Sequence, residues 1–151
     1  MRLLQGLTRH LLDSTNLKRE NINSYADNGE LITSGQDLGH GIEVARFKYD
    51  AVFELERYRG SAMDILATVT GWLIDNDPDR EAFNLADPEI NVEINDNDTA
   101  DVEIEIEFNE SIQIVEDDSG PIRAWGKRWK VADVPIDTAE SLVNMEGSTD
   151  G

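Results

Sequence analysis

The sequence predicts an α+β fold, in which a mostly antiparallel sheet of about four strands packs against a main amphipathic helix. Apolar and polar residues alternate over residues 45–55 and 101–108, and a period of two is typical of a strand with one buried face. Over residues 61–74, apolar residues recur every three or four positions, which is typical of an amphipathic helix. The length of 151 residues suits one domain, which we place at residues 1–135, with a short helix and a flexible tail at 136–151.

The N-terminal segment, residues 2–12, predicts a helix because its leucines fall at helical spacing. These apolar positions are Leu3, Leu4, Leu7, Leu11 and Leu12. Residues 13–28 are polar and rich in turn formers, and residues 29–33 are expected to form a short strand. The three glycines within residues 34–41 predict a mobile loop.

The central segment predicts a long strand followed by the main helix. The apolar face of residues 45–55 is rich in aromatic side chains. Ser61 is expected to cap the helix, with Asp64 three residues later as a variant of the capping box. Pro78 follows the helix and is expected to open a short second helix that ends near Leu85.

The next segment predicts an antiparallel hairpin, because residues 90–94 and 101–108 both alternate and are joined by the polar turn 95–100. The solvent face of the second strand carries Glu103, Glu105 and Glu107. Since like charges directly opposite each other destabilise a strand pair, we expect a basic or neutral residue across that face. Residues 111–115 are expected to add a further strand.

The net charge of −19 and the absence of cysteine restrict the classes of function. Without cysteine there are no disulfides, no thiolate metal sites and no cysteine nucleophile. A nucleic-acid-binding surface neutralises phosphates with Lys and Arg, so an acidic chain argues against such a surface as the main function. No apolar run approaches the roughly 20 residues that a membrane span needs, and no signal peptide is evident, so we expect a soluble protein of the cytosol. Self-association of so charged a chain is expected to depend on salt.

Catalytic and metal chemistry lacks a convincing set of side chains, and we predict no enzyme activity, no cofactor and no metal site. His10 and His40 have no third histidine and no cysteine to complete a zinc set, and neither has a nucleophile at a diagnostic spacing. A calcium loop that starts at Asp96 would place Glu107 correctly at its twelfth position, but Asp101 occupies the sixth, where glycine is required. With 32 acidic residues in the chain, close carboxylate pairs say nothing about acid–base catalysis.

A basic, aromatic segment at residues 123–130 differs from the rest of this acidic chain. It holds four of the 13 basic residues and two of the three tryptophans. Because Trp and Arg are enriched among the residues that anchor protein interfaces, the segment is either a docking arm or an ordinary amphipathic strand or hairpin. As a docking arm it would grip an acidic face of a neighbouring subunit. The candidate subunit-interface residues are Arg123, Trp125, Lys127, Arg128, Trp129 and Lys130.

The order of these elements over residues 3–115 resembles the tail completion protein R (GpR) family of contractile-tailed temperate phages. The resemblance rests on the tryptophan-bearing helix at 65–74, its Asp77-Pro78 exit, the acidic hairpin at 93–110 and an aromatic strand before them. The aromatic residues of that strand are Phe47, Tyr49 and Phe53. The resemblance implies a structural virion protein, similar to the tail terminators, which form rings, typically hexameric, that cap the tail tube. It implies no catalytic residues and no cofactor.

The resemblance also implies partners and a location. The expected partners are further copies of the chain, the tail tube protein, the neck or head connector proteins and the tail sheath. DNA is expected to pass through the ring without being specifically bound, and no membrane is involved. The expected location is the head-proximal end of the virion tail, after assembly in the host cytoplasm. Two alternatives stay open: a head–tail connector or stopper protein at the neck, and an acidic DNA mimic that binds a basic partner as a monomer.

Overall fold

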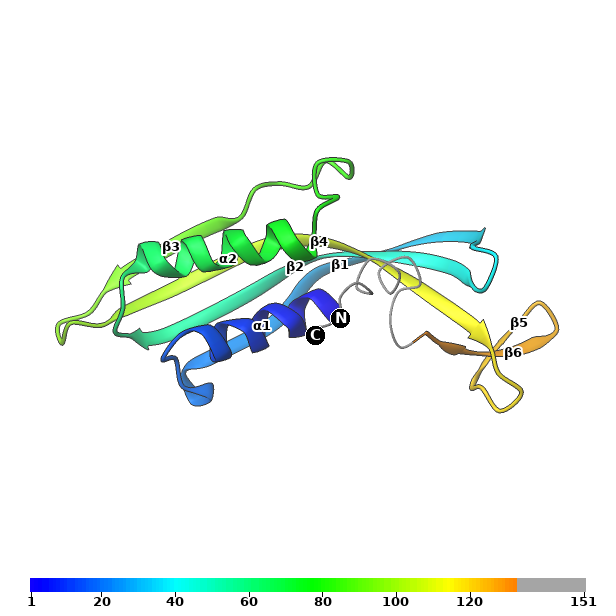
Figure 1. Ribbon diagram of the computed structural model, residues 1–151, viewed down its shortest axis with the longest axis horizontal. Coiled ribbons are helices and arrows are strands. Elements are labelled where there is room, and N and C mark those ends of the chain that lie inside the picture. The colour runs from blue at the N-terminus through cyan, green and yellow to red at the C-terminus, as the bar shows by residue number, and fades with distance from the viewer. Residues whose placement is uncertain (133–151) are drawn as a thin grey trace. The chain divides into compact units, whose positions relative to one another are not determined.

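A computed structural model describes residues 1–132, which form two α-helices, a short 3-10 helix and six strands. The helices are α1 (Arg2–Ser14), η1 (Arg19–Asn21) and α2 (Ala62–Asn76) (Figure 1). The strands are β1 (Ile22–Asp37), β2 (Ile42–Tyr58), β3 (Glu89–Ile94), β4 (Ala100–Glu116), β5 (Ile122–Ala124) and β6 (Lys127–Val131). The α+β class is confirmed, but the number of strands predicted, about four, is too low.

The six strands form one antiparallel sheet in the order β1-β2-β4-β6-β5, with β3 paired to β4 outside this path. The predicted hairpin at residues 90–108 is confirmed, because β3 and β4 pair in antiparallel register and Ile94 lies opposite Ala100 at the turn. A second hairpin joins β5 to β6, and β6 in turn pairs with the end of β4.

The described residues group into two compact units. Residues 1–30 and 48–110, here called the helix unit, contain both α-helices, β3 and parts of β1, β2 and β4. Residues 31–47 and the described residues from 111 onward, here called the hairpin unit, contain β5, β6 and the remaining parts of the long strands. The placement of one domain at 1–135 stays a prediction, and the helix and tail predicted at 136–151 lie outside the described residues.

In the helix unit, α1 and α2 pack against each other and against the apolar face of the strands (Figure 1). Gly6 lies where the two helices approach, since a Cβ atom there would be only 3.0 Å from Cζ2 of Trp72. Below the helices, the Phe108 ring makes edge contacts with Tyr49 and Trp72, at centroid distances of 5.8 and 6.5 Å. Full burial of a side chain such as Phe108 stabilises the fold by about 1.5–3 kcal/mol, whereas Trp72 is only partly buried. The other core side chains include Leu3, Leu7, Leu11, Phe53, Leu55, Ile65, Val69, Leu73, Val102, Ile104 and Ile106.

The N-terminal third differs from its prediction after the first helix. α1 is confirmed, and residues 29–33 are a strand as predicted. That strand is much longer than expected, because β1 runs from Ile22 to Asp37 and takes in residues predicted to be a polar, turn-rich segment (13–28) and a mobile loop (34–41). The loop between β1 and β2 is limited to residues 38–41. Few side chains of β1 are apolar and most are exposed, so its hydrophobic pattern is weak, and pairing with β2 defines the strand instead.

The central prediction is correct at the start of α2 and wrong after its end. Ser61 is the N-cap, and its Oγ accepts a hydrogen bond from the backbone N–H of Met63 at 3.1 Å. The predicted second helix at 77–85 is instead a series of turns. The strand predicted separately at 111–115 is the continuation of β4, which runs unbroken to Glu116.

Candidate interaction surfaces

All six residues predicted at a subunit interface lie on the β5–β6 hairpin. Trp125 and Gly126 form its two-residue turn, with φ of +52° and +72°, which matches the tight turn that suits the twist of a hairpin. Trp129 is buried, and its Nε1 donates a hydrogen bond to the carbonyl oxygen of Ala124 at 2.9 Å. Trp125 is 61% exposed, and its ring lies edge-on to Trp129 at 5.8 Å. Trp129 therefore holds the hairpin together, while Trp125 is presented to solvent.

The basic side chains of the hairpin are only partly neutralised. Lys127 Nζ lies 3.2 Å from Glu116, and Lys130 Nζ lies 3.8 Å from Asp117, and both pairs are exposed. Arg128 donates from Nε to the carbonyl oxygen of Gly120 at 2.8 Å and lies opposite Arg123 across the hairpin. Arg123 makes no ion pair within residues 1–132. Its guanidinium is thus available to a partner.

The second surface is the face of the sheet in the helix unit opposite α1 and α2, here called the open sheet face. Lys48 lies on it with its Nζ 3.4 Å from Glu107, which places alternate residues of β2 and β4 on the same side. The described helices do not cover this face (Figure 1). Its acidic residues are Asp50, Glu54, Glu89, Glu93, Asp101, Glu103, Glu105 and Glu107.

Cross-strand pairing on the open sheet face departs from the expectation of basic or neutral partners. That expectation is confirmed at Glu103, which lies opposite Asn91 of β3. It is wrong at Glu105, which lies opposite Glu89, and the next acidic pair is Asp101 with Glu93. Like charges in direct opposition weaken a strand pair, so this edge of the sheet carries uncompensated negative charge.

Two kinds of carboxylate are found on this face. Partial burial, followed by the nearby charges of Asp50 and Glu89, raises the pKa of Glu105 above its ordinary value. In contrast, a hydrogen bond from the backbone N–H of Ala86 holds the pKa of Glu107 below its ordinary value. The pKa of Asp101 is likewise lowered, first by the backbone N–H of Arg57. Asp101 and Glu107 thus serve the fold, whereas Glu105 makes no ion pair within residues 1–132.

Exposed apolar side chains are also found on α2 and on β3. Met63 and Ile74 of α2 are 74% and 68% exposed, and Ile94 of β3 is 76% exposed. The sequence interpretation did not identify these exposed side chains because it considered only one apolar stripe of α2. It expected that stripe to be buried at Ala62, Ile65, Leu66, Val69, Trp72 and Leu73, and the structure buries Ile65, Val69 and Leu73. The available signal was that residues 62–74 are apolar on almost all sides, which is unusual for a helix at a surface.

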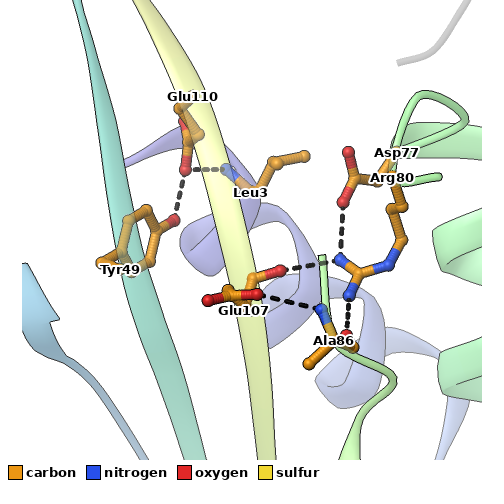
Figure 2. A network of polar contacts seen from close by, with 7 residues as sticks. All are labelled: Leu3, Tyr49, Asp77, Arg80, Ala86, Glu107 and Glu110. Atoms are coloured by element: carbon orange, nitrogen blue, oxygen red, sulfur yellow. Dashed lines mark hydrogen bonds and ion pairs between the residues drawn. The ribbon is translucent and has the colours of Figure 1, made fainter. Parts of the chain in front are cut away.

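A network of polar contacts connects the ends of elements in the helix unit (Figure 2). The Glu110 carboxylate accepts hydrogen bonds from the backbone N–H groups of Arg2 and Leu3, at 2.9 and 3.1 Å, and so satisfies the first turn of α1. The Tyr49 hydroxyl donates to the same carboxylate, and burial followed by this bond raises the pKa of Tyr49. Glu110 therefore connects β4, β2 and α1.

Arg80 forms the other half of this network (Figure 2). Its guanidinium donates to Asp77 at 2.9 Å and to the carbonyl oxygens of Glu107 and Ala86, at 2.8 and 2.6 Å. These bonds fix the turns at 78–84 against β4 in place of the predicted helix. The guanidinium donors and the Glu107 and Glu110 carboxylates are engaged in holding backbone and side chains of the fold, so the network is structural.

The candidates for metal binding and catalysis stay separate in the structure. Asp96 and Asp98 lie in the tight turn between β3 and β4. His10 lies on α1 near Ser14, and His40 lies in the β1–β2 loop. Within residues 1–132, no group of three or more His, Cys, Asp or Glu side chains is placed to hold a metal ion. Among these residues, no helix is both long and apolar enough to cross a membrane.

Comparison with known proteins identifies the family. The family model described as P2 phage tail completion protein R (GpR) matches residues 1–133. A protein of Haemophilus phage HP1 (strain HP1c1), described as an uncharacterized 19.2 kDa protein in the rep-hol intergenic region, is 28% identical over 147 residues. That match covers 93% of this chain and 87% of the relative, and no solved structure matches. The resemblance found in the sequence is thereby confirmed, and the chain belongs to the P2 phage tail completion protein R (GpR) family.

Proposed function

We propose that this protein completes the phage tail by forming a ring of identical subunits at its head-proximal end. The ring would close the tail tube and present a surface to the connector of the head. Family membership supports a structural role in the tail. Six is the number of subunits expected from the resemblance to tail terminators.

The observation that carries the proposal is that one chain bears two surfaces of opposite charge. The β5–β6 hairpin is basic and presents Trp125, whereas the open sheet face is acidic. A contact between two different surfaces of identical subunits is heterologous, and repeating it closes a ring when the rotation between subunits permits. Trp and Arg are also the residue types that dominate interface energetics.

The proposed partners follow from the position of the ring. One side of the ring would meet the tail tube protein and the tail sheath, and the other side would meet the neck or head connector proteins. DNA would pass through without being bound, since a chain with a net charge of −19 repels phosphates.

Native mass spectrometry of the full chain across a salt series tests the ring. Each subunit carries a large negative charge, so repulsion between subunits is strongest at low salt and is screened as salt rises. We expect monomers at low salt and a closed ring at physiological salt. Monomers at every salt concentration, both free and on purified tail tubes, would contradict ring formation.

Binding to purified assemblies tests the location. We expect the protein to cosediment with tail tubes and to label one end of the tail, next to the head, with gold-conjugated antibody. Binding to the portal and neck complex alone would favour a connector or stopper instead. A monomer that competes with DNA for a basic protein would favour the DNA mimic.

A further inference from the structure

We propose that the open sheet face of one copy is the docking site for the β5–β6 hairpin of a second copy. The inference rests on the self-assembly in the proposed function and adds to it the two surfaces that meet. Each subunit would use its hairpin on one neighbour and its open sheet face on the other.

The first step is the uneven distribution of charge along the chain. Residues 48–110 contain 18 of the 32 acidic residues but only four of the 13 basic ones. Residues 119–132 contain four basic residues and no acidic residue. Charge complementarity guides association and disfavours wrong contacts, so the hairpin is the segment of this chain best suited to an acidic surface.

The second step is the state of the open sheet face without a partner. Glu89 lies opposite Glu105, and Glu93 lies opposite Asp101, so two like-charged pairs occupy adjacent strands. The exposed Glu103 lies between these pairs on β4. Lys48 is bound to Glu107, and among the described residues the only cation that lowers the pKa of a carboxyl group in these pairs is Arg57, beside Asp101. Within residues 1–132, Glu89, Glu103 and Glu105 make no ion pair. A cationic side chain placed over β3 and β4 would attract the carboxylates of both strands and offset their mutual repulsion. This face is therefore suited to a basic partner.

The third step is that the basic side chains of the hairpin can leave their present ion pairs with little loss of folding stability. The pair of Lys127 with Glu116 is exposed and that of Lys130 with Asp117 is largely exposed, and such surface pairs contribute little to the stability of a fold. Arg123 has no ion pair within the described residues. These cations can therefore turn to a neighbour while Trp129 keeps the hairpin folded.

The fourth step is that the open sheet face also offers an aromatic contact. Tyr25 of β1 is partly exposed, and its hydroxyl points to Glu54 of β2 at 3.5 Å. An aromatic ring beside carboxylates suits an arginine, which can stack on the ring and bind a carboxylate at once. Trp125, at the tip of the hairpin, brings a second exposed ring to the contact.

Two charge-reversed variants of the full chain test this contact. The hairpin variant carries Arg123→Glu, Lys127→Glu and Lys130→Glu, and leaves Arg128 and Trp129, which hold the hairpin, in place. The face variant carries Glu89→Lys, Glu93→Lys and Glu103→Lys, which are exposed and make no hydrogen bond that fixes the backbone. It leaves Asp101 and Glu107, which accept backbone hydrogen bonds, unchanged.

We expect each variant alone to lose the ring mass in native mass spectrometry under conditions in which the wild type forms the ring. In a mixture, the acidic hairpin of one variant meets the lysine face of the other, and the remaining basic hairpin meets the remaining acidic face. The mixture should therefore recover rings with equal numbers of the two chains. A chain that carries all six substitutions should assemble by itself again.

Two control variants change the net charge outside the contact, by four charges each, where each charge-reversed variant changes it by six. Asp13→Lys with Asp75→Lys adds positive charge in the last turns of α1 and α2, where a cation interacts favourably with the helix dipole. For the hairpin, the control is Lys18→Glu with Arg19→Glu, which are exposed residues near η1. Both controls should assemble as the wild type does, and the circular dichroism spectrum should stay unchanged in every variant.

Three results would overturn the inference. Rings formed by either charge-reversed variant alone, to the same extent as by the wild type, would mean that another surface makes the contact, and the proposed function would stand. Loss of tail-tube binding by the face variant, with its ring intact, would assign the open sheet face to a basic partner of the tube. A wild type that stays monomeric at every salt concentration, both free and on purified tail tubes, would remove the proposed ring and this contact together.

Discussion

The helix unit and the hairpin unit are stabilised by different kinds of contact. The helix unit has a continuous apolar core, in which Tyr49, Phe53 and Phe108 are almost completely buried beneath two helices. The hairpin unit relies on Trp129, Ile114 and a polar cluster around the buried Glu43, whose carboxylate accepts from Ser34, Arg46 and Ser111 at 2.7–3.0 Å. The first unit is therefore insensitive to surface changes, whereas the second depends on a few contacts.

This difference explains why the helix unit tolerates like-charged pairs across its strands. A like-charged cross-strand pair is destabilising by less than about 1 kcal/mol, which is small beside the burial of several aromatic and aliphatic side chains. The helix unit can thus carry the acidic pairs of β3 and β4 and still fold. Apart from the pair of Arg46 with the buried Glu43, the hairpin unit uses its charges in the pairs of Lys127 and Lys130, which are largely exposed and stabilise it little.

The largest effect is expected from Phe108→Ala, which removes the aromatic centre of the helix unit. Phe108 is 0% exposed and contacts the rings of Tyr49 and Trp72. Replacing such a side chain with alanine lowers the free energy of unfolding by about 3–5 kcal/mol, through lost burial and the cavity that remains. Urea denaturation monitored by circular dichroism measures the loss.

Phe83→Ala is the matched control, because Phe83 lies in the turns after α2 and is 39% exposed. It should lower the free energy of unfolding by less than about 1 kcal/mol. Equal losses for the two variants would contradict the description of the helix unit as stabilised by its apolar core and insensitive to surface changes.

The next effect distinguishes the two tryptophans of the hairpin. Trp129→Ala removes a buried ring and the hydrogen bond to Ala124, and should destabilise the hairpin unit by about 3 kcal/mol. Trp125→Ala removes an exposed ring and should change stability by less than about 0.5 kcal/mol while weakening self-association. Hydrogen exchange of the β6 amides measures the first effect, and native mass spectrometry measures the second. If Trp125→Ala reduced the protection of the β6 amides, or if Trp129→Ala left it unchanged, the assignment of Trp129 to stability and Trp125 to self-association would be wrong.

The sequence predicted the fold best where the hydrophobic period was strong. α1, the start of α2, β2 and the β3–β4 hairpin were all anticipated, because each has a regular apolar face. Most of β1 was missed because its residues are mostly polar and exposed, so that backbone pairing with β2 defines it. The turns at 78–84 were taken for a helix because nothing in local propensity reveals that Arg80 binds the carbonyl oxygens of Glu107 and Ala86.

The candidate site was predicted in composition but not in detail. Residues 123–130 were selected from their charge and tryptophan content, and the structure brings them onto one hairpin. The separate roles of Trp125 and Trp129 follow from strand alternation around a tight turn, which the sequence interpretation did not assign. The opposition of Glu89 and Glu105 depends on the register between β3 and β4, and alternation alone does not define that register.

A smaller effect is expected from Arg80→Met, which tests how the helix unit fixes its turns. The variant leaves the Asp77 carboxylate without its cation and two carbonyl oxygens without their donor. Unsatisfied, partly buried acceptors lower the free energy of unfolding by about 2 kcal/mol at neutral pH. Chemical denaturation at several pH values measures the effect.

The pH dependence of Arg80→Met follows from the state of Asp77. Burial already raises the pKa of Asp77, and the loss of Arg80 raises this pKa further. A raised pKa in the folded state means that stability is fully present below the ordinary value of 3.8 and is lost as pH rises through the folded pKa. The defect should therefore shrink in acid, and adding Asp77→Asn should restore part of the stability at neutral pH. A defect that is the same at every pH would contradict this account.

The smallest effect, and the one that tests the acidic sheet most directly, is expected from Glu89→Gln. This variant removes one charge opposite Glu105, whose pKa is raised by partial burial and by the charges of Asp50 and Glu89. Since the folded-state pKa of Glu105 lies above its ordinary value of 4.5, its ionisation weakens the fold as pH rises through that pKa. Glu89→Gln should lower the pKa of Glu105 and raise the free energy of unfolding at neutral pH by a few tenths of a kcal/mol.

The gain should shrink in acid, as the Glu105 carboxyl group becomes protonated and its repulsion with Glu89 is lost. Carbon-detected NMR titration of the Glu105 carboxyl group measures the pKa, and urea denaturation measures the gain. Glu81→Gln, in the turns after α2, is the control and should change neither quantity. An unchanged pKa of Glu105 in the Glu89→Gln variant would mean that repulsion across β3 and β4 is too weak to favour a basic partner on this face. A lowered pKa of Glu105 together with a higher free energy of unfolding would show that the acidic pairs of the open sheet face destabilise the isolated subunit.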